Sequence, residues 1–360
     1  MDVLEQWAPP VLQESYDNSG LLVGDPTASI QSVLVSLDCT EAVVEEAVRR
    51  GAGMIVSHHP IVFQGLKRLT GSNHVERTVM AAIRHGVALY AIHTNLDNVA
   101  DGVNQKLATA VGCMPESLRI LRPKPAVLNQ IVVYVPQEHA GSVQDAMFDA
   151  GAGKIGQYDE CGWAVQGQGT FRPLPGSKPY SGEEGVRSEV GEVRVEVVVE
   201  TWKLSEVLVA LKEAHPYEEV AHSIWTLTNT SGYVGSGMVG ELAAPMPEGV
   251  FLDQLKKNLG CGAVRHTDLL EKPILKVAVC GGSGSFLLSD AIRCGADVFV
   301  TSDFKYHEFF GAENRLVIAD VGHYESEWQT THLIVSRLNN KFTNFAVHLA
   351  EANPNPIHYR

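Results

Sequence analysis

The stretch GMIVSHHPIV, Gly53 to Val62, runs an apolar strand into two adjacent histidines and then reaches Pro60. Its run Met54-Ile55-Val56 is typical of a buried parallel strand. An isolated pair of imidazoles would be a poor way to finish a hydrophobic core, because polar groups are costly to bury without partners. The stretch therefore predicts an α/β fold in which the end of this strand carries chemistry.

Strands and helices alternate on both sides of this stretch, from residue 31 to residue 122. Thr40 precedes a helical segment as an N-cap and Gly51 follows it as a stop, which are common helix boundaries. Residues 275–349 repeat the alternation. The pattern predicts an outer α/β domain, discontinuous in sequence, whose two segments form the halves of one mainly parallel sheet.

Residues 124–229 follow a different pattern and lie between a proline-rich segment, RPKPAV, and a polar segment, TNTSGY. Both segments have the composition of linkers. Strands and helices between them follow the order β-α-β-β-α-β, which is ferredoxin-like. We therefore predict an inserted ferredoxin-like α+β domain at 124–229, with the outer α/β domain built from 1–123 and 230–360.

Composition excludes several classes of protein. The chain has 360 residues, 45% of them apolar and 19% charged, as in an ordinary globular protein. Its net charge of -14, without a lysine or arginine run, argues against a nucleic-acid partner. The sequence shows neither a secretory signal nor a transmembrane stretch, so no membrane partner is expected. Six cysteines without a C-x-x-C pair predict free thiols in a cytoplasmic location.

Candidate ligands follow four of the predicted strands. In an open α/β sheet, ligands bind at the carboxyl ends of the strands, because loops and helix N-termini converge there. A lone histidine at a strand end is more often structural, so the prediction depends on several strand ends converging. The candidates are His58 and His59; His93, Asn95 and Asp97; Asp303, Lys305 and His307; and His323 with Glu327, whose spacing of four places both on one face of a helical turn.

Imidazoles and carboxylates without thiolates favour an open site for zinc, iron or manganese over a structural zinc site. This many ligands predicts two divalent ions, which Asp97 or Glu327 could bridge at roughly 3.5–4 Å. No organic cofactor is expected, since the chain has no Walker loop and no full G-x-G-x-x-G. The glycine-rich turn at Cys280–Ser285 remains open between a phosphate cradle and a tight βα turn, and the cluster at His215–His222 is expected to be structural or interfacial.

Seven segments resemble one protein family, the NGG-interacting-factor-like dinuclear metal proteins, often named GTP cyclohydrolase type-two homologues. They are SYDNSGLLVG (15–24), VSHHPIVF (56–63), HTNLDN (93–98), GSGMVGEL (235–242), the turn Cys280–Gly284, TSDFKYHE (301–308) and DVGHYESE (320–327). The middle segment resembles the insert of longer bacterial members, which is similar to small trimeric signalling and copper-tolerance proteins.

The resemblance implies that the metal ligands are His58, His59, Asp97, His323 and Glu327, with His93 beside the metals as a proton relay. Ser302 stands where the family more often has glycine, and we expect it to add a side chain near the mouth of the pocket. The family similarity also implies a toroidal homohexamer.

Two hypotheses follow for the function. The first is a metal-dependent hydrolase acting on a nucleotide-like or phosphorylated small molecule, with His93 moving a proton and Lys305 or His307 orienting an anionic substrate. The alternative is a non-catalytic metal-binding regulatory or scaffold protein that senses a small ligand through the inserted domain. The sequence leaves the metal, the substrate and the choice between the two hypotheses open.

Overall fold

The computed structural model describes residues 1–352 and 355–360. They form two compact units, one made of Met1–Pro123 with Tyr233–Arg360 and the other of Lys124–Gly232. The predicted mixed α/β class is confirmed, since each unit packs helices against sheets. Within the described residues, no helix combines the length and the apolar character needed to cross a membrane.

The first sheet of the larger unit has five strands in the order β1-β4-β3-β2-β15. Its strands β15, β2, β3 and β4 run parallel, and β1 is antiparallel to β4. The strands span Gly20–Val23 (β1), Ser32–Ser36 (β2), Met54–Ser57 (β3), Ala88–Ala91 (β4) and Ala346–Leu349 (β15). The helices of this segment are α1 (Asp2–Trp7), α2 (Glu41–Arg50), α3 (His74–His85), α4 (Thr94–Asp97) and α5 (Val103–Ala110).

Local signals place α2 where the sequence predicted a helix. The hydroxyl oxygen of Thr40 accepts a hydrogen bond from the backbone N–H of Val43, and Gly51 ends the helix in the left-handed conformation at φ 67°. The predicted cap and stop are confirmed. Because α2 and α3 pack on the sheet, the apolar strand β3 that precedes His58 is buried in the core.

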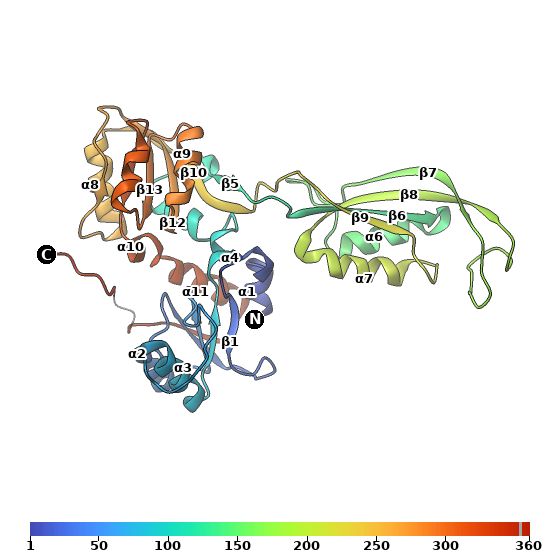
Figure 1. Cartoon of the computed structure of the whole chain (residues 1–360), viewed down its shortest axis with the longest axis horizontal. Helices are drawn as coiled ribbons and strands as arrows, with labels where there is room; N and C mark the ends of the chain where they lie inside the picture. The colour runs from blue at the N-terminus through green and yellow to red at the C-terminus, as the bar shows by residue number, and fades with distance from the viewer. Residues whose placement is uncertain (353–354) are drawn as a thin grey trace. The chain divides into compact units, whose positions relative to one another are not determined.

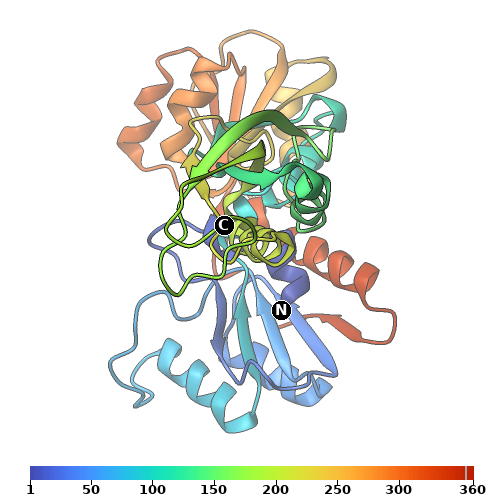
Figure 2. The same ribbon diagram turned by 90° about the vertical axis from the view of Figure 1, so that its right-hand side faces the viewer.

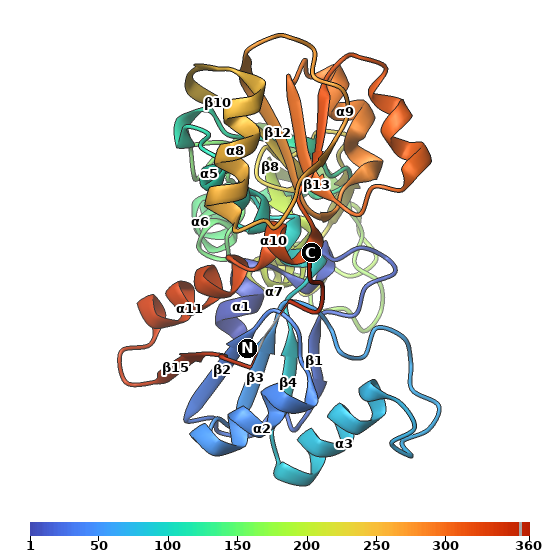
Figure 3. The same cartoon turned by 90° about the vertical axis from the view of Figure 1, so that its left-hand side faces the viewer.

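The second sheet has six strands in the order β11-β14-β13-β12-β10-β5, of which β12, β13 and β14 are parallel. They span Arg119–Pro123 (β5), Gly235–Met246 (β10), Arg265–His266 (β11), Ile274–Ser283 (β12), Val298–Ser302 (β13) and Val317–Asp320 (β14). The helices are α8 (Glu248–Leu259), α9 (Leu288–Arg293), α10 (His323–Glu327) and α11 (Thr330–Lys341). Figure 3 shows this sheet above the first one, with α10 and α11 between them.

The expectation of one sheet made by both outer segments is wrong, because the larger unit contains two. The last strand, β15, does not join the sheet of its own segment but pairs in parallel with β2, where Ala346 lies opposite Ser32. Figures 2 and 3 show this red strand beside the blue strands of the first sheet. Local hydrophobic patterns predict that a strand exists, whereas its partner depends on packing between distant segments.

The smaller unit has a four-stranded antiparallel sheet in the order β7-β8-β6-β9. Its elements are β6 (Leu128–Pro136), α6 (Ala140–Asp149), β7 (Gly162–Phe171), β8 (Ser188–Glu200), α7 (Leu204–Ala214) and β9 (His222–Thr226), which is the predicted β-α-β-β-α-β order. Figure 1 shows α6 and α7 on the same face of this sheet. Their apolar side chains bury one face of the strands, with Val133, Met147 and Val195 fully buried between them.

Short 3-10 helices complete the chain. They span Pro10–Leu12 (η1), Pro115–Ser117 (η2), Gln137–His139 (η3), Thr201–Lys203 (η4), Ser285–Leu287 (η5) and Tyr306–Ala312 (η6).

Candidate metal centre

Side chains from both sheets of the larger unit gather at one place. Three groups form there, and within each group the potential ligand atoms lie within 4.8 Å of one another. Because the groups share members, they make one cluster. The first group is His58, His59 and His93, the second is His59, His323 and Glu327, and the third is His58, Asp97 and Glu327.

The first sheet supplies its members from the ends of β3 and β4. Beyond the end of β3, the backbone N–H groups of His58 and His59 donate to Ser36 and Leu37 of the neighbouring strand segment. This pairing continues the parallel alignment and fixes both histidines at the carboxyl edge of the sheet. Asp97 closes the short helix α4 after β4, where its carbonyl oxygen accepts a hydrogen bond from Asn104.

The second sheet supplies His323 and Glu327 from α10, which follows β14. The Nε2 atom of His323 lies 3.0 Å from the Oε2 atom of Glu327, one helical turn later. The predicted placement of this pair on one face of a helical turn is confirmed. Figure 3 shows α10 between the two sheets, so its side chains can reach residues of the first sheet.

Each histidine of the cluster uses its Nδ1 atom to contact an acceptor outside the cluster. The acceptors are the backbone oxygen of Ile92 for His58 at 2.8 Å, Asp38 for His59 at 2.8 Å, Asp303 for His323 at 2.6 Å and Asp17 for His93 at 2.7 Å. We assign the proton of each neutral ring to Nδ1 from these contacts. The lone pair then lies on Nε2, as in histidines that bind metals.

Glu327 joins the two ends of the cluster. Its Oε2 atom is 3.0 Å from the Nε2 atom of His59 and 3.0 Å from that of His323. Its Oε1 atom is 3.8 Å from the Nε2 atom of His58. That same nitrogen is 3.6 Å from the Oδ1 atom of Asp97. The two oxygens of one buried carboxylate therefore belong to two different ligand groups.

The pKa shifts of the cluster side chains favour a positive charge at this position. Burial by itself lowers the pKa of His59, but its hydrogen bonds with Asp38 and Glu327 outweigh burial and raise the pKa to about 10. Burial likewise lowers the pKa of His323, but Glu327 and Asp303 raise it to about 11. Burial and the neighbouring charge of Glu327 raise the pKa of Asp97 to about 7. These shifts all favour a cation among the side chains.

The residues fit a divalent metal ion. The Nε2 atom of His58 and the Oδ1 atom of Asp97 are buried, and neither has a hydrogen-bond partner in the described part of the chain. The Nε2 atoms of His59 and His323 lie only 3.3 Å apart, although in the assigned tautomers both carry lone pairs. A divalent ion between His58 and Asp97 would give both of these atoms a partner, and one between His59 and His323 would relieve the close approach of their two lone pairs. Among the described residues, the three candidate groups contain no cysteine, so the ligands are nitrogen and oxygen only.

His93 lies at the edge of this cluster as a member of its first group, whereas Lys305 and His307 lie outside it. The ring of His93 is 5.3 Å from that of His58 and 5.4 Å from that of His59. Lys305 and His307 are exposed at the start of η6. The ring of His307 contacts Tyr306 and Phe310, and within the described ranges neither Lys305 nor His307 has a contact with the cluster.

Two carboxylates that support the cluster were missed at the level of sequence. Asp38 follows β2, so the strand-end rule could have found it. Asp17 precedes β1, which gives no such signal. Because β1 is antiparallel to β4, with Gly20 opposite Ala91, the start of β1 lies at the carboxyl end of β4. This explains how Asp17 reaches His93.

The glycine-rich turn at the end of β12 packs directly against Glu327. A Cβ atom on Gly282, whose φ is +61°, would lie 2.4 Å from Oε1 of Glu327. The hydroxyl of Ser302 donates to the carbonyl of Gly282 at 2.6 Å, and the N–H of Gly282 donates to Ser326 at 3.0 Å. The turn is therefore a tight support for the cluster. The expectation that Ser302 lies at the mouth of a pocket is wrong, because its side chain is fully buried under this turn.

The fold and the cluster define a class of α/β protein. In this class, two β-sheets bring histidines and carboxylates together as a candidate divalent-metal centre. The model of the family Duf34/NIF3 (NGG1p interacting factor 3) matches residues 1–356. The chain belongs to this family.

Relatives extend over nearly the whole chain. A Halalkalibacterium halodurans protein named GTP cyclohydrolase 1 type 2 homolog is 38% identical over 325 residues, covering 90% of this chain and 87% of its own. A Bacillus subtilis protein with the same name is 35% identical and covers 99% of this chain and 96% of its own. The crystal structure of a Bacillus cereus protein related to NIF3 matches with a TM-score of 0.86 and 34% identity, covering 100% of this chain and 97% of that one.

Proposed function

We propose that this protein is a dinuclear metal-dependent hydrolase acting on a nucleotide-like or phosphorylated small molecule. The observation that carries the proposal is the position of Glu327, whose two carboxylate oxygens face different ligand groups. His58 and Asp97 would hold one ion, His59 and His323 the other, and Glu327 would contact both. The names of the relatives, GTP cyclohydrolase 1 type 2 homolog, support a nucleotide as the substrate.

The charge of the surrounding carboxylates supports two ions. Asp17, Asp38, Asp97, Asp303 and Glu327 each contact a cluster histidine. With neutral imidazoles, these carboxylates leave a concentrated negative charge that two divalent ions would largely neutralise. Zinc, iron and manganese all accept this set of nitrogen and oxygen ligands. When bound, such ions act as Lewis acids and lower the pKa of a coordinated water from 15.7 to about 7.

His93 is placed to move a proton at the edge of the cluster. Its Nδ1 atom is 2.7 Å from Asp17, and the Asp17 carboxylate also accepts hydrogen bonds from the backbone N–H and side-chain hydroxyl of Thr94. These contacts fix the orientation of the ring, so that Nε2 can accept a proton from a reacting group. Lys305 and His307, exposed on η6, would contact the anionic part of a substrate, and this role requires the substrate to extend beyond the cluster.

Turnover after metal reconstitution tests the proposal. The purified protein would be loaded with zinc, manganese or iron and assayed against a panel of nucleotides and phosphoesters. We expect metal-dependent hydrolysis of at least one compound, its loss in Asp97→Ala, and normal activity in Asp268→Ala, which removes an exposed carboxylate of the same unit. Equal rates in the Asp97 and Asp268 variants would refute a catalytic site at the cluster.

The cytoplasmic location and the toroidal homohexamer belong to this proposal as well. Free cysteines support the location, since all six lack a disulfide partner and four are buried. Membership of the family supports the toroidal homohexamer. Light scattering of the purified protein tests this oligomeric state, and we expect six copies per particle.

The alternative is a metal-binding regulatory protein that senses a small ligand. A cavity of about 690 Å³ in the smaller unit favours this alternative. Full metal loading without turnover of any compound in the panel would support it over the hydrolase.

A further inference from the structure

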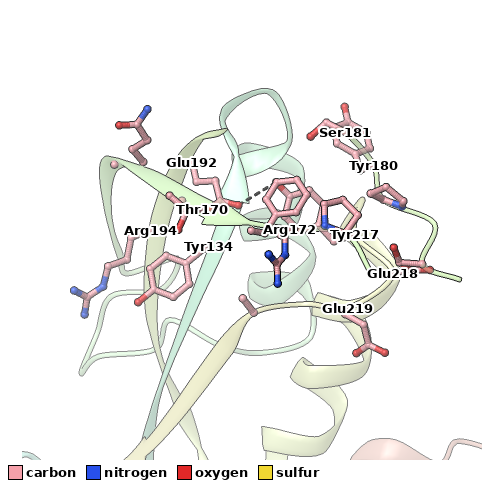
Figure 4. Close-up of a pocket in the computed structure, with 18 of the residues that line it drawn as sticks. Tyr134, Thr170, Arg172, Tyr180, Ser181, Glu192, Arg194, Tyr217, Glu218 and Glu219 are labelled. Atoms are coloured by element: carbon pink, nitrogen blue, oxygen red, sulfur yellow. Dashed lines mark hydrogen bonds between the residues drawn. The ribbon is translucent and has the colours of Figure 1, made fainter. Parts of the chain in front are cut away.

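The inserted unit contains a cavity of about 690 Å³, which lies within the size range of small-molecule sites in proteins. All residues that line it belong to the smaller unit, so it is separate from the metal cluster. Its walls come from β7, from the loop that follows β7, and from the segment Tyr217–Ala221 before β9. Figure 4 shows side chains from these segments around the cavity.

The floor of the cavity is the face of the sheet that the helices leave open. In the register of the sheet, Arg194 lies opposite Tyr134 on one side and Val165 on the other, so these three side chains project from the same face. In the next row, Glu192 lies opposite Gly167. A Cβ atom on Gly167 would meet nothing within 4 Å. Because Gly167 has no side chain, the space beside it forms part of the cavity.

Hydrogen bonds and ring contacts fix the loop after β7, which forms the remaining wall of the cavity. The loop after β7 donates a hydrogen bond from the backbone of Lys178 to Glu218 at 2.7 Å. The hydroxyl of Tyr180 is 3.1 Å from the Nε2 atom of His139, and the ring of Tyr180 is 5.9 Å from that of Tyr217. These contacts connect the loop to the rest of the inserted unit, so the fold itself defines the shape of the cavity.

The lining combines aromatic rings with hydrogen-bond donors that lack partners. Tyr134, Tyr180 and Tyr217 line the cavity, and aromatic rings pack well against a flat ligand. The Nε atom of Arg194 and the hydroxyl of Ser181 line the same cavity, and both are buried without a hydrogen-bond partner among the residues described. Such atoms are costly to bury, so a ligand that supplies an acceptor would relieve that cost.

The charged residues of the lining are two arginines, Arg172 and Arg194, and three glutamates, Glu192, Glu218 and Glu219. Two of the acidic residues in the lining already accept hydrogen bonds: Glu192 from the hydroxyl of Tyr217 at 3.0 Å, and Glu218 from the loop backbone. Figure 4 shows the guanidinium groups of Arg172 and Arg194. Arg194 also pairs with Glu196 at 2.9 Å, whereas Arg172 has no ion pair among the described residues and is therefore the main group available to an anion. Guanidinium groups bind carboxylates, sulfonates and phosphates through paired donors.

We propose that this cavity binds a small planar aromatic molecule that carries an anionic group. The rings of Tyr134 and Tyr217 contact the flat part, and Arg172 and Arg194 contact the anion. The site does not depend on the metal cluster or on the hydrolase proposal, because no residue of the cluster belongs to the inserted unit.

The test uses 5-aminonaphthalene-1-sulfonate, a fluorescent aromatic anion that a hydrolase acting on phosphoesters would leave intact. Its neutral matched compound is the corresponding sulfonamide. We expect the full-length protein to bind the sulfonate with a dissociation constant below about 1 mM, and about tenfold more tightly than the sulfonamide. No binding of the sulfonate, or equal binding of the two compounds, would overturn the proposal.

Two glycine variants locate the binding site. Gly167→Leu places a side chain in the cavity, because a Cβ atom there meets nothing within 4 Å. Gly191→Leu is its control, since it also meets nothing within 4 Å but lies in β8 outside the cavity lining. We expect Gly167→Leu to weaken sulfonate binding at least tenfold and Gly191→Leu to leave it unchanged. Equal binding by the two variants would place the ligand elsewhere and refute the site.

Arg172→Gln gives an independent readout if Gly167→Leu fails to fold. We expect the preference for the sulfonate over the sulfonamide to fall from about tenfold toward equality, while the sulfonamide affinity stays the same. An unchanged preference would show that this guanidinium does not bind the anion and would contradict the proposed mode of binding.

Discussion

Replacing Gly282 with alanine should disrupt metal binding without removing any metal ligand. The added Cβ atom would lie 2.4 Å from Oε1 of Glu327, about 1 Å short of the 3.4 Å at which ordinary contacts begin. The turn cannot easily move away, because Ser302 and Ser326 hold the two sides of the Gly282 peptide. The carboxylate of Glu327 must therefore shift by about 1 Å, which exceeds the tolerance of about 0.2 Å in metal–ligand distances.

The size of the loss follows from the role of the displaced group. Disturbing residues that merely support a metal ligand costs about 10–100-fold in affinity. Glu327 is itself a proposed ligand to both ions, so we expect a loss near the upper end, about 100-fold or 2.7 kcal/mol. Competition with a chromophoric chelator measures the affinity, and elemental analysis measures the number of ions per chain.

Gly86→Ala is the matched control for backbone strain. Gly86 has a φ of +64°, close to that of Gly282, and a Cβ atom there would meet nothing within 4 Å. Both variants carry a strain of about 1 kcal/mol from a left-handed alanine, so both should unfold at a somewhat lower temperature. Only Gly282→Ala should lose metal. If both variants bind two ions as tightly as the unmodified protein, Glu327 is not a shared ligand.

Three further predictions concern the same centre. Asp97→Asn should reduce the bound metal from two ions to one per chain in elemental analysis, and retention of two ions would exclude this carboxylate as a ligand. Chelation should lower the melting temperature, because metal present at 100 times its dissociation constant stabilises the fold by about 2.7 kcal/mol, and the same treatment should leave a Glu327→Gln variant unaffected. Apparent affinity should fall as the pH drops from about 8 to 5, because metals must displace protons from imidazoles, and the raised pKa values of His59 and His323 keep both protonated at neutral pH in the metal-free protein. A flat affinity profile in the chelator competition would contradict this last prediction.

The candidate ligands could be picked out from the sequence because their positions obey a local rule. His58 and His59 end one strand, Asp97 follows another, and His323 with Glu327 follows a third. Each position can be recognised from an apolar run that stops at a polar residue, without knowing which strands are neighbours. The structure brings these positions together, although they lie up to 269 residues apart in sequence.

The supporting residues were harder to predict, because their positions depend on pairing between strands. Asp17 reaches His93 only because β1 runs antiparallel to β4. The sequence pattern around Gly282 leaves a phosphate cradle and a tight turn open, and the hydrogen bonds to Ser302 and Ser326 identify the tight turn. A local sequence pattern shows neither the pairing of β1 with β4 nor the hydrogen bonds of Gly282. The prediction of a single sheet failed for the same reason, since strand partners such as β15 and β2 come from opposite ends of the chain.

The position of the insert explains how the chain can carry an additional unit between the two halves of its metal centre. The strand β5 leaves the larger unit at Pro123, and β10 returns to it at Gly235, directly opposite in the antiparallel pair. The inserted unit therefore occupies the place of a hairpin loop. Closing a hairpin requires only that its two ends be adjacent, so a folded unit whose ends lie close together can replace the loop without changing the register of either strand. The candidate ligands follow β3 or lie in α4 and α10, none of which adjoins this connection in sequence. The metal centre and the cavity of the insert can therefore be changed independently, and a variant at Gly167 or Gly282 should affect only its own site.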